Sequence, residues 1–357
     1  MEAADQVIRY AEHDGAPVAW SAIGRGPPLV LGGWWCSHLD LDWRQPRFRR
    51  FASGLAQGRT IIRYDRPGTG ASDRGRVPPR TLDEELAVLE AVLAAAGVAR
   101  ASLFGASSGG GVASLFAARH PDAVDRLVLY GTYARGADLA PPAARDALLA
   151  VVRQHWGIGS RVLSDLFEPD ATAAERDEFV EFQRRAATPE AALASLAEVY
   201  AMDSTAHLGE VRAPTLVLHR REDRAIAFAL GRDVADRIPH AGFVPLHGED
   251  HFPWRGDADA IVRETRRFLG DRVEPAGDAP AAATGDAGAA ASGTPHLTER
   301  EREVLRLVAR GETDAEIAAH LVLSVHTVHR HVANIRSRLG VPSRAAAAAW
   351  ALRTGLI

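Results

Sequence analysis

The chain has 357 residues, and at about 150 residues per domain this length predicts two domains. Apolar residues make up 46% and charged residues 25%, the balance of a folded protein with a sizeable core. All 42 basic residues are arginine. The missing lysine excludes a pyridoxal-phosphate Schiff base, a P-loop nucleotide site, a protein kinase and a lysine-dependent phospho-receiver. The single cysteine, Cys36, excludes an internal disulfide and a zinc site of paired cysteines, and we expect no metal and no cofactor.

The distribution of charge and hydropathy indicates where the chain acts. No apolar run reaches 18 residues, and Met1–Tyr10 lacks a basic and then apolar signal region. We therefore expect a cytoplasmic protein with no membrane partner. The net charge is −4, but residues 296–357 carry nine arginines against six acidic residues, so the tail is basic and the rest is acidic. A basic tail on an acidic body indicates an anionic partner for the tail.

Short apolar runs alternate with helical patterns through residues 1–270. Six runs are predicted strands, at residues 29–31, 60–64, 101–104, 127–130, 215–219 and 242–246. One predicted helix begins at Thr81 with the capping-box sequence T-L-D-E and continues to Ala96. The alternation predicts an α/β fold with a mostly parallel sheet and helices on both faces. It breaks at about residues 135–207, which are helical in pattern, and there we expect a helical lid over the carboxyl edge of the sheet.

The pentapeptide G-A-S-S-G at Gly105–Gly109 lies between a predicted strand and a predicted helix. A G-x-S-x-G sequence at such a turn predicts a serine nucleophile on a strained elbow. Ser107 takes the middle position, whereas Ser108 would put Ala106 in place of the first glycine. The helix N-terminus beside it favours developing negative charge. A glycine- and serine-rich turn without chemistry is the alternative that the pentapeptide alone leaves open.

A serine nucleophile needs a base, and the base needs a carboxylate to orient it. Two later segments present such groups directly after predicted strands: V-L-H-R-R-E-D-R presents Asp223, and F-V-P-L-H-G-E-D-H presents His251. Because the carboxyl ends of parallel strands collect at one edge of a sheet, we expect both to meet Ser107 there. Glu222 is the alternative acid and His247 the alternative base, and we favour Asp223 and His251.

Residues 271–294 separate the body from the tail. This segment is rich in alanine, glycine, proline and aspartate and has no large apolar residue after Val273. It cannot bury enough apolar surface to order itself, which predicts a flexible linker. The predicted domains are therefore residues 1–270 and residues 295–357.

Four short helices are predicted in the tail. The sequence T-E-R-E from Thr298 begins the first helix, and T-D-A-E from Thr313 begins the second. Ser324 caps the third helix, and Ser343 caps a last helix that runs to Arg353. Two short helices joined by a tight turn at this spacing indicate a helix-turn-helix unit.

The third predicted helix has an apolar stripe and a polar side. Val328, Val332, Ile335 and Leu339 recur at helical spacing, so we expect them to face the core of the tail. The candidate DNA contacts on the remaining surface are His326, Thr327, His329, Arg330, Asn334 and Arg338. Arg330 is the candidate for a bidentate contact to guanine. A solvated polar face on a small helical module is the alternative.

The body resembles the α/β-hydrolase superfamily over Gln6–Phe268. The resemblance is carried by Y-D-R-P-G-T-G-A-S-D at Tyr64–Asp73, by the serine pentapeptide and by the two segments around the acid and the histidine. It implies an oxyanion hole made by the backbone N–H groups of Trp34 and Ser108, and ester, lactone, thioester or amide substrates. The family's usual His-Gly is here Gly32-Gly33, a departure in the loop that carries Trp34.

The tail resembles the LuxR-type (GerE) DNA-binding domain over nearly the whole of Leu297–Val341. The resemblance implies binding to paired half-sites on double-stranded DNA, and hence a homodimer on DNA. One departure matters: His329 replaces the lysine that usually follows Thr-Val. A histidine makes a weaker and pH-sensitive contact with phosphate or base.

Two functional hypotheses follow. In the first, the chain is a one-component bacterial transcription regulator of LuxR type whose body senses a small apolar ester- or lactone-like ligand and could also hydrolyse it. In the second, it is a serine esterase or lactonase with an accessory DNA-binding tail. We favour the first because a DNA-reading domain has few other uses. Tryptophans are candidates for lining an apolar ligand pocket, although ordinary packing would explain each of them: Trp34, Trp35, Trp43 and Trp156.

Overall fold

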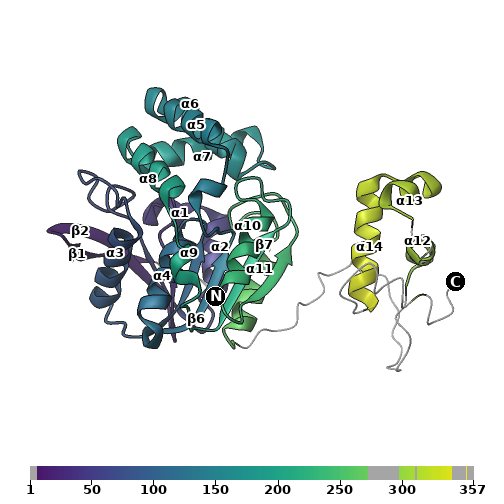
Figure 1. Cartoon of the computed structure of the whole chain (residues 1–357), viewed down its shortest axis with the longest axis horizontal. Helices are drawn as coiled ribbons and strands as arrows, with labels where there is room; N and C mark the ends of the chain where they lie inside the picture. Colours follow the sequence, from purple (N-terminus) through teal and green to yellow (C-terminus); the bar gives the residue numbers. More distant parts are fainter. Residues whose placement is uncertain (1–5, 272–296, 310–311, 340–350, 352–357) are drawn as a thin grey trace. The chain divides into compact units, whose positions relative to one another are not determined.

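The computed structural model describes residues 6–271, 297–309, 312–339 and 351. The chain forms two compact units, residues 1–276 and 277–357 (Figure 1). Almost all of the predicted linker, residues 272–294, lies outside the described residues. So does the predicted last helix from Ser343 to Arg353, except for Ala351, which is helical and buried.

The body is built on one eight-stranded sheet with the strand order β1-β2-β4-β3-β5-β6-β7-β8. The strands are β1 (Val7–His13), β2 (Ala16–Gly24), β3 (Pro28–Leu31), β4 (Thr60–Tyr64), β5 (Ala101–Ala106), β6 (Val124–Tyr130), β7 (Thr215–Arg220) and β8 (Gly242–Leu246). Strands β3 to β8 run parallel, while β2 is antiparallel to both β1 and β4. The predicted α/β fold with a mostly parallel sheet is confirmed.

The six predicted strands correspond to β3–β8, but the β1–β2 hairpin was not predicted. Its turn consists of Asp14 and Gly15, both at positive φ (49° and 71°). Asp-Gly is a favoured sequence for such a two-residue turn, so it was a usable signal. β1 lies at the sheet edge, and only Ala11 in it is buried, so the strand lacks a clear apolar alternation.

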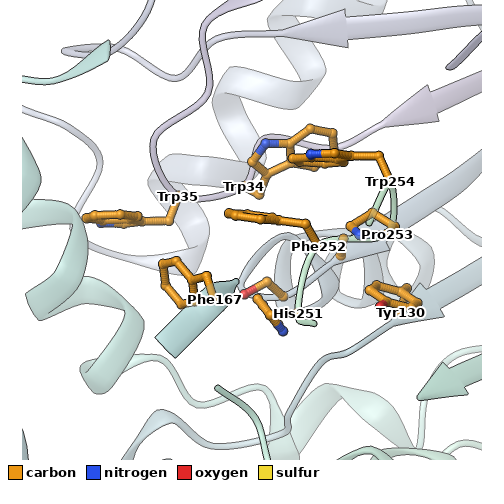
Figure 2. Close-up of a pocket in the computed structure, with 10 residues that line it drawn as sticks. Trp34, Trp35, Tyr130, Phe167, His251, Phe252, Pro253 and Trp254 are labelled. Atoms are coloured by element: carbon orange, nitrogen blue, oxygen red, sulfur yellow. The ribbon is translucent and has the colours of Figure 1, made fainter. Parts of the chain in front are cut away.

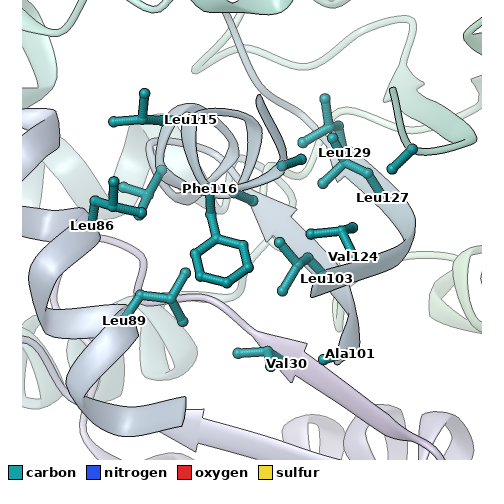
Figure 3. Close-up of a cluster of buried hydrophobic side chains, with 14 of the residues drawn as sticks. Val30, Leu86, Leu89, Ala101, Leu103, Leu115, Phe116, Val124, Leu127 and Leu129 are labelled. Carbon is teal, nitrogen blue, oxygen red and sulfur yellow. The ribbon is translucent and has the colours of Figure 1, made fainter. Parts of the chain in front are cut away.

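Helices cover both faces of the sheet. The body helices outside the insertion are α1 (Leu39–Arg44), α2 (Pro46–Leu55), α3 (Leu82–Ala95), α4 (Gly109–Arg119), α10 (Phe228–Arg237) and α11 (Ala258–Phe268). On one face, α3, α4 and α10 pack in a single apolar cluster with the strands; Figure 3 shows Leu86, Leu115 and Phe116 of that cluster. On the other face, α2 and α11 pack against the sheet.

The predicted helix at residues 81–96 is α3, and its N-terminus is capped by Thr81. The Thr81 hydroxyl accepts a hydrogen bond from the Glu84 N–H at 3.2 Å. The Glu84 carboxylate accepts from the N–H of Arg80 rather than that of Thr81, so only half of the predicted capping box forms.

Five helices are inserted between β6 and β7, and we call residues 142–208 the cap. They are α5 (Pro142–Gln154), α6 (Trp156–Phe167), α7 (Ala173–Ala186), α8 (Pro189–Ala201) and α9 (Thr205–Leu208). Apolar side chains of α5, α6, α7 and α8 form a cluster with Trp35 and Cys36, which follow β3, and with Phe252, which follows β8. The cap therefore packs on loops at the carboxyl ends of the strands (Figure 1).

The tail unit contains α12 (Glu299–Ala309), α13 (Asp314–Leu321) and α14 (Val325–Leu339). Complete capping boxes at Thr298 and Thr313 begin the first two helices. In α14, the Ser324 hydroxyl accepts from the Thr327 N–H at 3.1 Å. The predicted stripe of α14 faces the tail's apolar core, as expected. No helix of the described residues, in body or tail, has the length and apolarity that crossing a membrane requires.

Candidate active site and helix-turn-helix unit

Ser107 lies at the turn between β5 and α4, as the pentapeptide predicts. Its φ of 54° is in the left-handed region, which non-glycine residues rarely adopt. The turn is held from both sides, because the Ser107 N–H donates to the carbonyl of Tyr130 (3.0 Å) and the Thr132 hydroxyl donates to the carbonyl of Ser107 (2.7 Å). Ser107 is partly exposed, in contrast to the buried Ser108 beside it.

The strand and the helix that flank Ser107 approach each other closely at Gly105. A Cβ atom at this position would lie 2.8 Å from the Gly109 carbonyl oxygen and 2.9 Å from the Ala113 Cβ. The first glycine of the pentapeptide is therefore required by packing, as expected for a serine on a sharp strand-to-helix turn.

Asp223 and His251 form a buried hydrogen-bonded pair. His251 Nδ1 lies 2.9 Å from Asp223 Oδ2. Since a carboxylate oxygen only accepts, Nδ1 is the donor to Asp223, and in the tautomer with its proton on Nδ1 the other nitrogen, Nε2, can act as a base. The other carboxylate oxygen, Oδ1, accepts from the N–H groups of Ala225 (2.9 Å) and Ile226 (3.0 Å).

These contacts keep the Asp223 carboxylate ionised. Burial raises the pKa of the Asp223 carboxyl, but the His251 imidazole, its hydrogen bond and the Ile226 N–H together hold that pKa below its ordinary value. A second buried imidazole, His219, lies 3.9 Å from Asp223 Oδ2 and donates from Nε2 to the Ile226 carbonyl (2.9 Å). Burial lowers the pKa of His219, so this ring is neutral and supports the loop that carries Asp223.

The alternative acid and base have other roles. The Glu222 carboxylate accepts from the Gly248 N–H at 3.1 Å, on the exposed side of the same loops. β8 ends at Leu246, and His247 directly follows it. The structure brings together Asp223 and His251, and not Glu222 and His247.

Ser107 and His251 line one small, mostly apolar cavity (Figure 2). The rest of its lining consists of Trp34, Trp35, Ala106, Tyr130, Phe167, Phe252, Pro253 and Trp254. The cavity volume is about 20 Å³, roughly the room that one water molecule needs. Of the four candidate tryptophans, Trp34 and Trp35 line the cavity, while Trp43 and Trp156 are buried in the apolar clusters on either side.

Trp34 and Ser108 are the two residues that the family resemblance assigns to an oxyanion hole. Trp34 lines the cavity, and Ser108 directly follows Ser107 at the N-terminus of α4. Within the described part of the chain, neither of their backbone N–H groups donates to another protein group. Both donors are therefore available to a bound oxygen.

The cap reaches the histidine directly through Phe167, the last residue of α6. The backbone N–H of His251 donates to the backbone carbonyl of Phe167 at 2.9 Å. The Phe167 ring lies over the imidazole, with 5.5 Å between ring centroids. Sequence reasoning missed Phe167, because nothing in the local pattern of the cap points to this contact. It also missed Phe252 and Trp254, although both closely follow His251 in the sequence.

The helix-turn-helix unit of the tail consists of α13, the turn at residues 322–324, and α14. All six candidate DNA contacts belong to α14. Asn334 is exposed and Thr327 is partly exposed, its hydroxyl 2.8 Å from that of Ser324. The side chains of His326, His329, Arg330 and Arg338 lie outside the described part of the structure.

The described residues contain no group of three or more histidine, cysteine, aspartate or glutamate side chains that could hold a metal ion. The chemistry available at the cavity is that of a serine hydroxyl, an imidazole, a carboxylate and backbone amides. The sheet, the inserted cap and the order Ser107, Asp223, His251 define the class of an α/β-hydrolase-fold protein.

Comparison with known families agrees for both units. Residues 31–257 match the α/β hydrolase fold family, and residues 295–351 match the bacterial regulatory proteins of the luxR family. The chain therefore belongs to the α/β hydrolase fold family, and it carries a LuxR-type helix-turn-helix DNA-binding domain at its C-terminal side.

Individual relatives cover one unit or the other. The chain is 28% identical over 235 residues to 2-hydroxymuconate semialdehyde hydrolase of Pseudomonas putida, covering 60% of this chain and 79% of that protein. It is 45% identical over 65 residues to the transcriptional regulatory protein LiaR of Bacillus subtilis, covering 18% of this chain and 31% of LiaR. The crystal structure of an enol-lactonase from Burkholderia xenovorans is similar with a TM-score of 0.61 and 25% identity, covering 74% of this chain and all of that one.

Proposed function

We propose that this protein is a one-component transcription regulator whose hydrolase-fold body binds a small apolar ester- or lactone-like ligand at Ser107. The observation that carries the proposal is the Asp223–His251 hydrogen bond beside a cavity that Ser107 also lines, in a chain that continues into a LuxR-type domain. A body that detects a ligand and a tail that binds DNA would need no second protein to pass the signal.

The proposed chemistry at the cavity is acyl transfer. His251 Nε2 accepts the Ser107 hydroxyl proton as Oγ attacks the carbonyl carbon of the ligand. The N–H groups of Trp34 and Ser108 stabilise the resulting oxyanion, and Asp223 stabilises the imidazolium that forms. His251 then gives the proton to the leaving alkoxide, and water releases the acid from Ser107 in a second cycle.

The cavity constrains the ligand and the motion that admits it. Its walls are largely aromatic, which favours an apolar acyl or alkyl group over a charged one. A volume of about 20 Å³ is too small for an ester, so the Phe167 end of α6 moves when a ligand binds. Phe167 belongs to the cap and contacts His251, so its movement would transmit the presence of a ligand in the cavity to the rest of the cap.

The proposed partner of the tail is double-stranded DNA, bound in the cytoplasm by a homodimer on paired half-sites. The residues proposed to contact DNA are His326, Thr327, His329, Arg330, Asn334 and Arg338. The proposal is supported by the luxR family match and by the packing of the α14 stripe into the tail core, which leaves the other side of this helix for a partner.

A second candidate function is a serine esterase or lactonase that carries a DNA-binding tail. The observation that favours it is the presence of all the groups a hydrolase needs, since a receptor has no use for a complete set. The similarity to an enol-lactonase structure supports the same reading. Turnover as fast as that of ordinary esterases would favour this candidate, and slow turnover or stoichiometric acylation would favour the regulator.

A thermal-shift ligand screen on the full chain tests the proposal, with wild type and Ser107→Ala compared. A receptor keeps its ligand-induced shift in Ser107→Ala, whereas a covalent sensor loses it. Hydrolysis of p-nitrophenyl esters measured in parallel separates sensing from catalysis. Folded protein that shows neither a shift nor turnover with any ester or lactone would contradict the proposal.

A further inference from the structure

Arg220, the last residue of β7, places a buried guanidinium against the loop that carries His251. Its exposed fraction is 1%, among the lowest of the charged residues. Buried arginines need acceptors for their N–H groups, and a carboxylate is the usual partner. The hydrogen bonds that Arg220 makes go instead to main-chain carbonyls.

Three carbonyls of the His251 loop accept from this guanidinium. One nitrogen, Nη1, donates to the carbonyls of Asp250 (2.7 Å) and Phe252 (3.0 Å). The other, Nη2, donates to the carbonyl of Arg255. Asp250 and Phe252 are the two chain neighbours of His251, so the backbone is held on both sides of the imidazole.

The loop is shaped to pass around the guanidinium. Gly248 and Gly256 lie on the two sides of residues 250–255, and their φ values are 116° and 54°. A Cβ atom at Gly248 would lie 3.4 Å from Arg220 Cδ, and one at Gly256 would lie 3.5 Å from Nη2. Both glycines thus permit a left-handed backbone at points where it passes close to Arg220.

A second arginine, Arg224, links the same two loops nearer the surface. Arg224 forms an ion pair with Glu249, and the side chains of this pair are 59% and 37% exposed. Exposed ion pairs of this kind contribute little to the free energy of folding. Arg224 therefore joins the same two loops as Arg220 but without the buried contacts to the neighbours of His251.

We propose that Arg220 is a positioning residue for His251. Its guanidinium fixes residues 250–255 so that the imidazole stays on Asp223 and faces Ser107. The planar fork of arginine serves three carbonyls in fixed directions, which the single ammonium of lysine does not. This inference rests on the proposed acyl-transfer function and adds to it the residue that holds the base in place.

The test compares Arg220→Lys with Arg224→Lys in the full chain. Both variants keep the positive charge and shorten a side chain that contacts the loop carrying His251. The first readout is the rate at which a fluorophosphonate modifies Ser107, a reaction in which the serine oxygen bonds to phosphorus, fluoride leaves and His251 takes the proton. The second is the downfield proton resonance of the His251 Nδ1–H, which reports the hydrogen bond to Asp223 without any reaction.

We expect Arg220→Lys to slow the modification by about 10- to 100-fold, since displacements near 1 Å have effects of this size. The Nδ1–H resonance should shift or broaden in this variant. Arg224→Lys should stay within about twofold of wild type and keep the resonance. Wild-type values for Arg220→Lys in both readouts would overturn the proposal.

Two further outcomes keep the inference separate from the proposed function. If wild type is not modified by the reagent, the acyl-transfer proposal fails, and the resonance alone decides the role of Arg220. If Arg220→Lys does not fold, hydrogen exchange in wild type decides it. Slow exchange at the amides of residues 250–252, 254 and 255, as in the core strands, would support the proposal, and exchange at the rate of a surface loop would overturn it.

Discussion

The body and the tail build their candidate functional surfaces in different ways. In the tail, the elements are specified by short-range sequence: each capping box spans four residues, and the apolar stripe lies within one helix. In the body, Ser107 and His251 are 144 positions apart and line one cavity only because the sheet brings the ends of β5, β7 and β8 to one edge. The body's site therefore depends on the whole fold, whereas the tail's surface depends on a few local choices.

The largest expected effect is the loss of ester turnover when Ser107 is replaced, a change that should leave DNA binding by the tail intact. Ser107→Ala should lower ester turnover at least about 1,000-fold, because the nucleophile is lost. The melting temperature and the affinity for DNA should not change, since Ser107 is only partly buried and lies outside the apolar clusters of the body. Steady-state assays with p-nitrophenyl esters, a thermal melt and a DNA titration check this. Residual turnover near the wild-type rate would show that another group does the chemistry.

A substitution in the tail should do the reverse and weaken DNA binding without changing ester turnover. Arg330→Ala should weaken DNA binding by about 1–3 kcal/mol, which is roughly 5- to 150-fold, and relax the preference for guanine at one position. Ester turnover should stay at the wild-type value. Fluorescence anisotropy on matched and mismatched half-sites measures the effect. An equal loss of affinity for every sequence would assign Arg330 to phosphate contact rather than to base readout.

The two units should also respond to pH in opposite directions. In the body, burial raises the pKa of Glu85 from 4.5 to about 7, although Arg66 beside it opposes the shift. A raised pKa in the folded state gives stability that is present at low pH and is lost as the pH rises towards 7. We expect the body's melting temperature to fall between pH 5 and 8, and less so in Glu85→Gln.

In the tail, the pKa of Glu316 is lowered by hydrogen bonds from the N–H and the hydroxyl of Thr313. A lowered pKa in the folded state stabilises the tail at pH values above 4.5, the ordinary pKa of the group. This stabilisation is lost as the pH falls below 4.5. Calorimetric scans of the full chain from about pH 3 to pH 8 compare the two units. A body that becomes more stable towards pH 8 would contradict the assignment for Glu85.

The smallest effect uses one motif that occurs in both units. Thr172 and Thr313 each begin a helix with a complete capping box. Replacing either threonine with alanine should lower the free energy of unfolding of its unit by about 1 kcal/mol. The same loss should shift the melting temperature of the small tail by about 4–8 °C and that of the larger body by about 2–4 °C. Equal shifts would show that the two units do not unfold independently.

The three predicted site residues could be proposed from the sequence because each lies in a loop after a strand, within a recognisable segment. Ser107 is marked by its glycines, and Asp223 and His251 by their order and their places after β7 and β8. The cavity wall was harder to predict. Phe167 contacts His251 only through the packing of the cap on the sheet, and Arg220 binds main-chain carbonyls, which leave no pattern in the sequence. β1 was missed because an exposed edge strand has no buried face to impose an alternation.

The most direct test of the account is to map the covalent adduct after treatment with a fluorophosphonate. We predict one modification per chain, located on Ser107 by peptide mass spectrometry and abolished in His251→Ala, which lacks the base. A folded wild-type protein that takes up no adduct, or that takes it up at another residue, would contradict the claim that Ser107, Asp223 and His251 act as one unit.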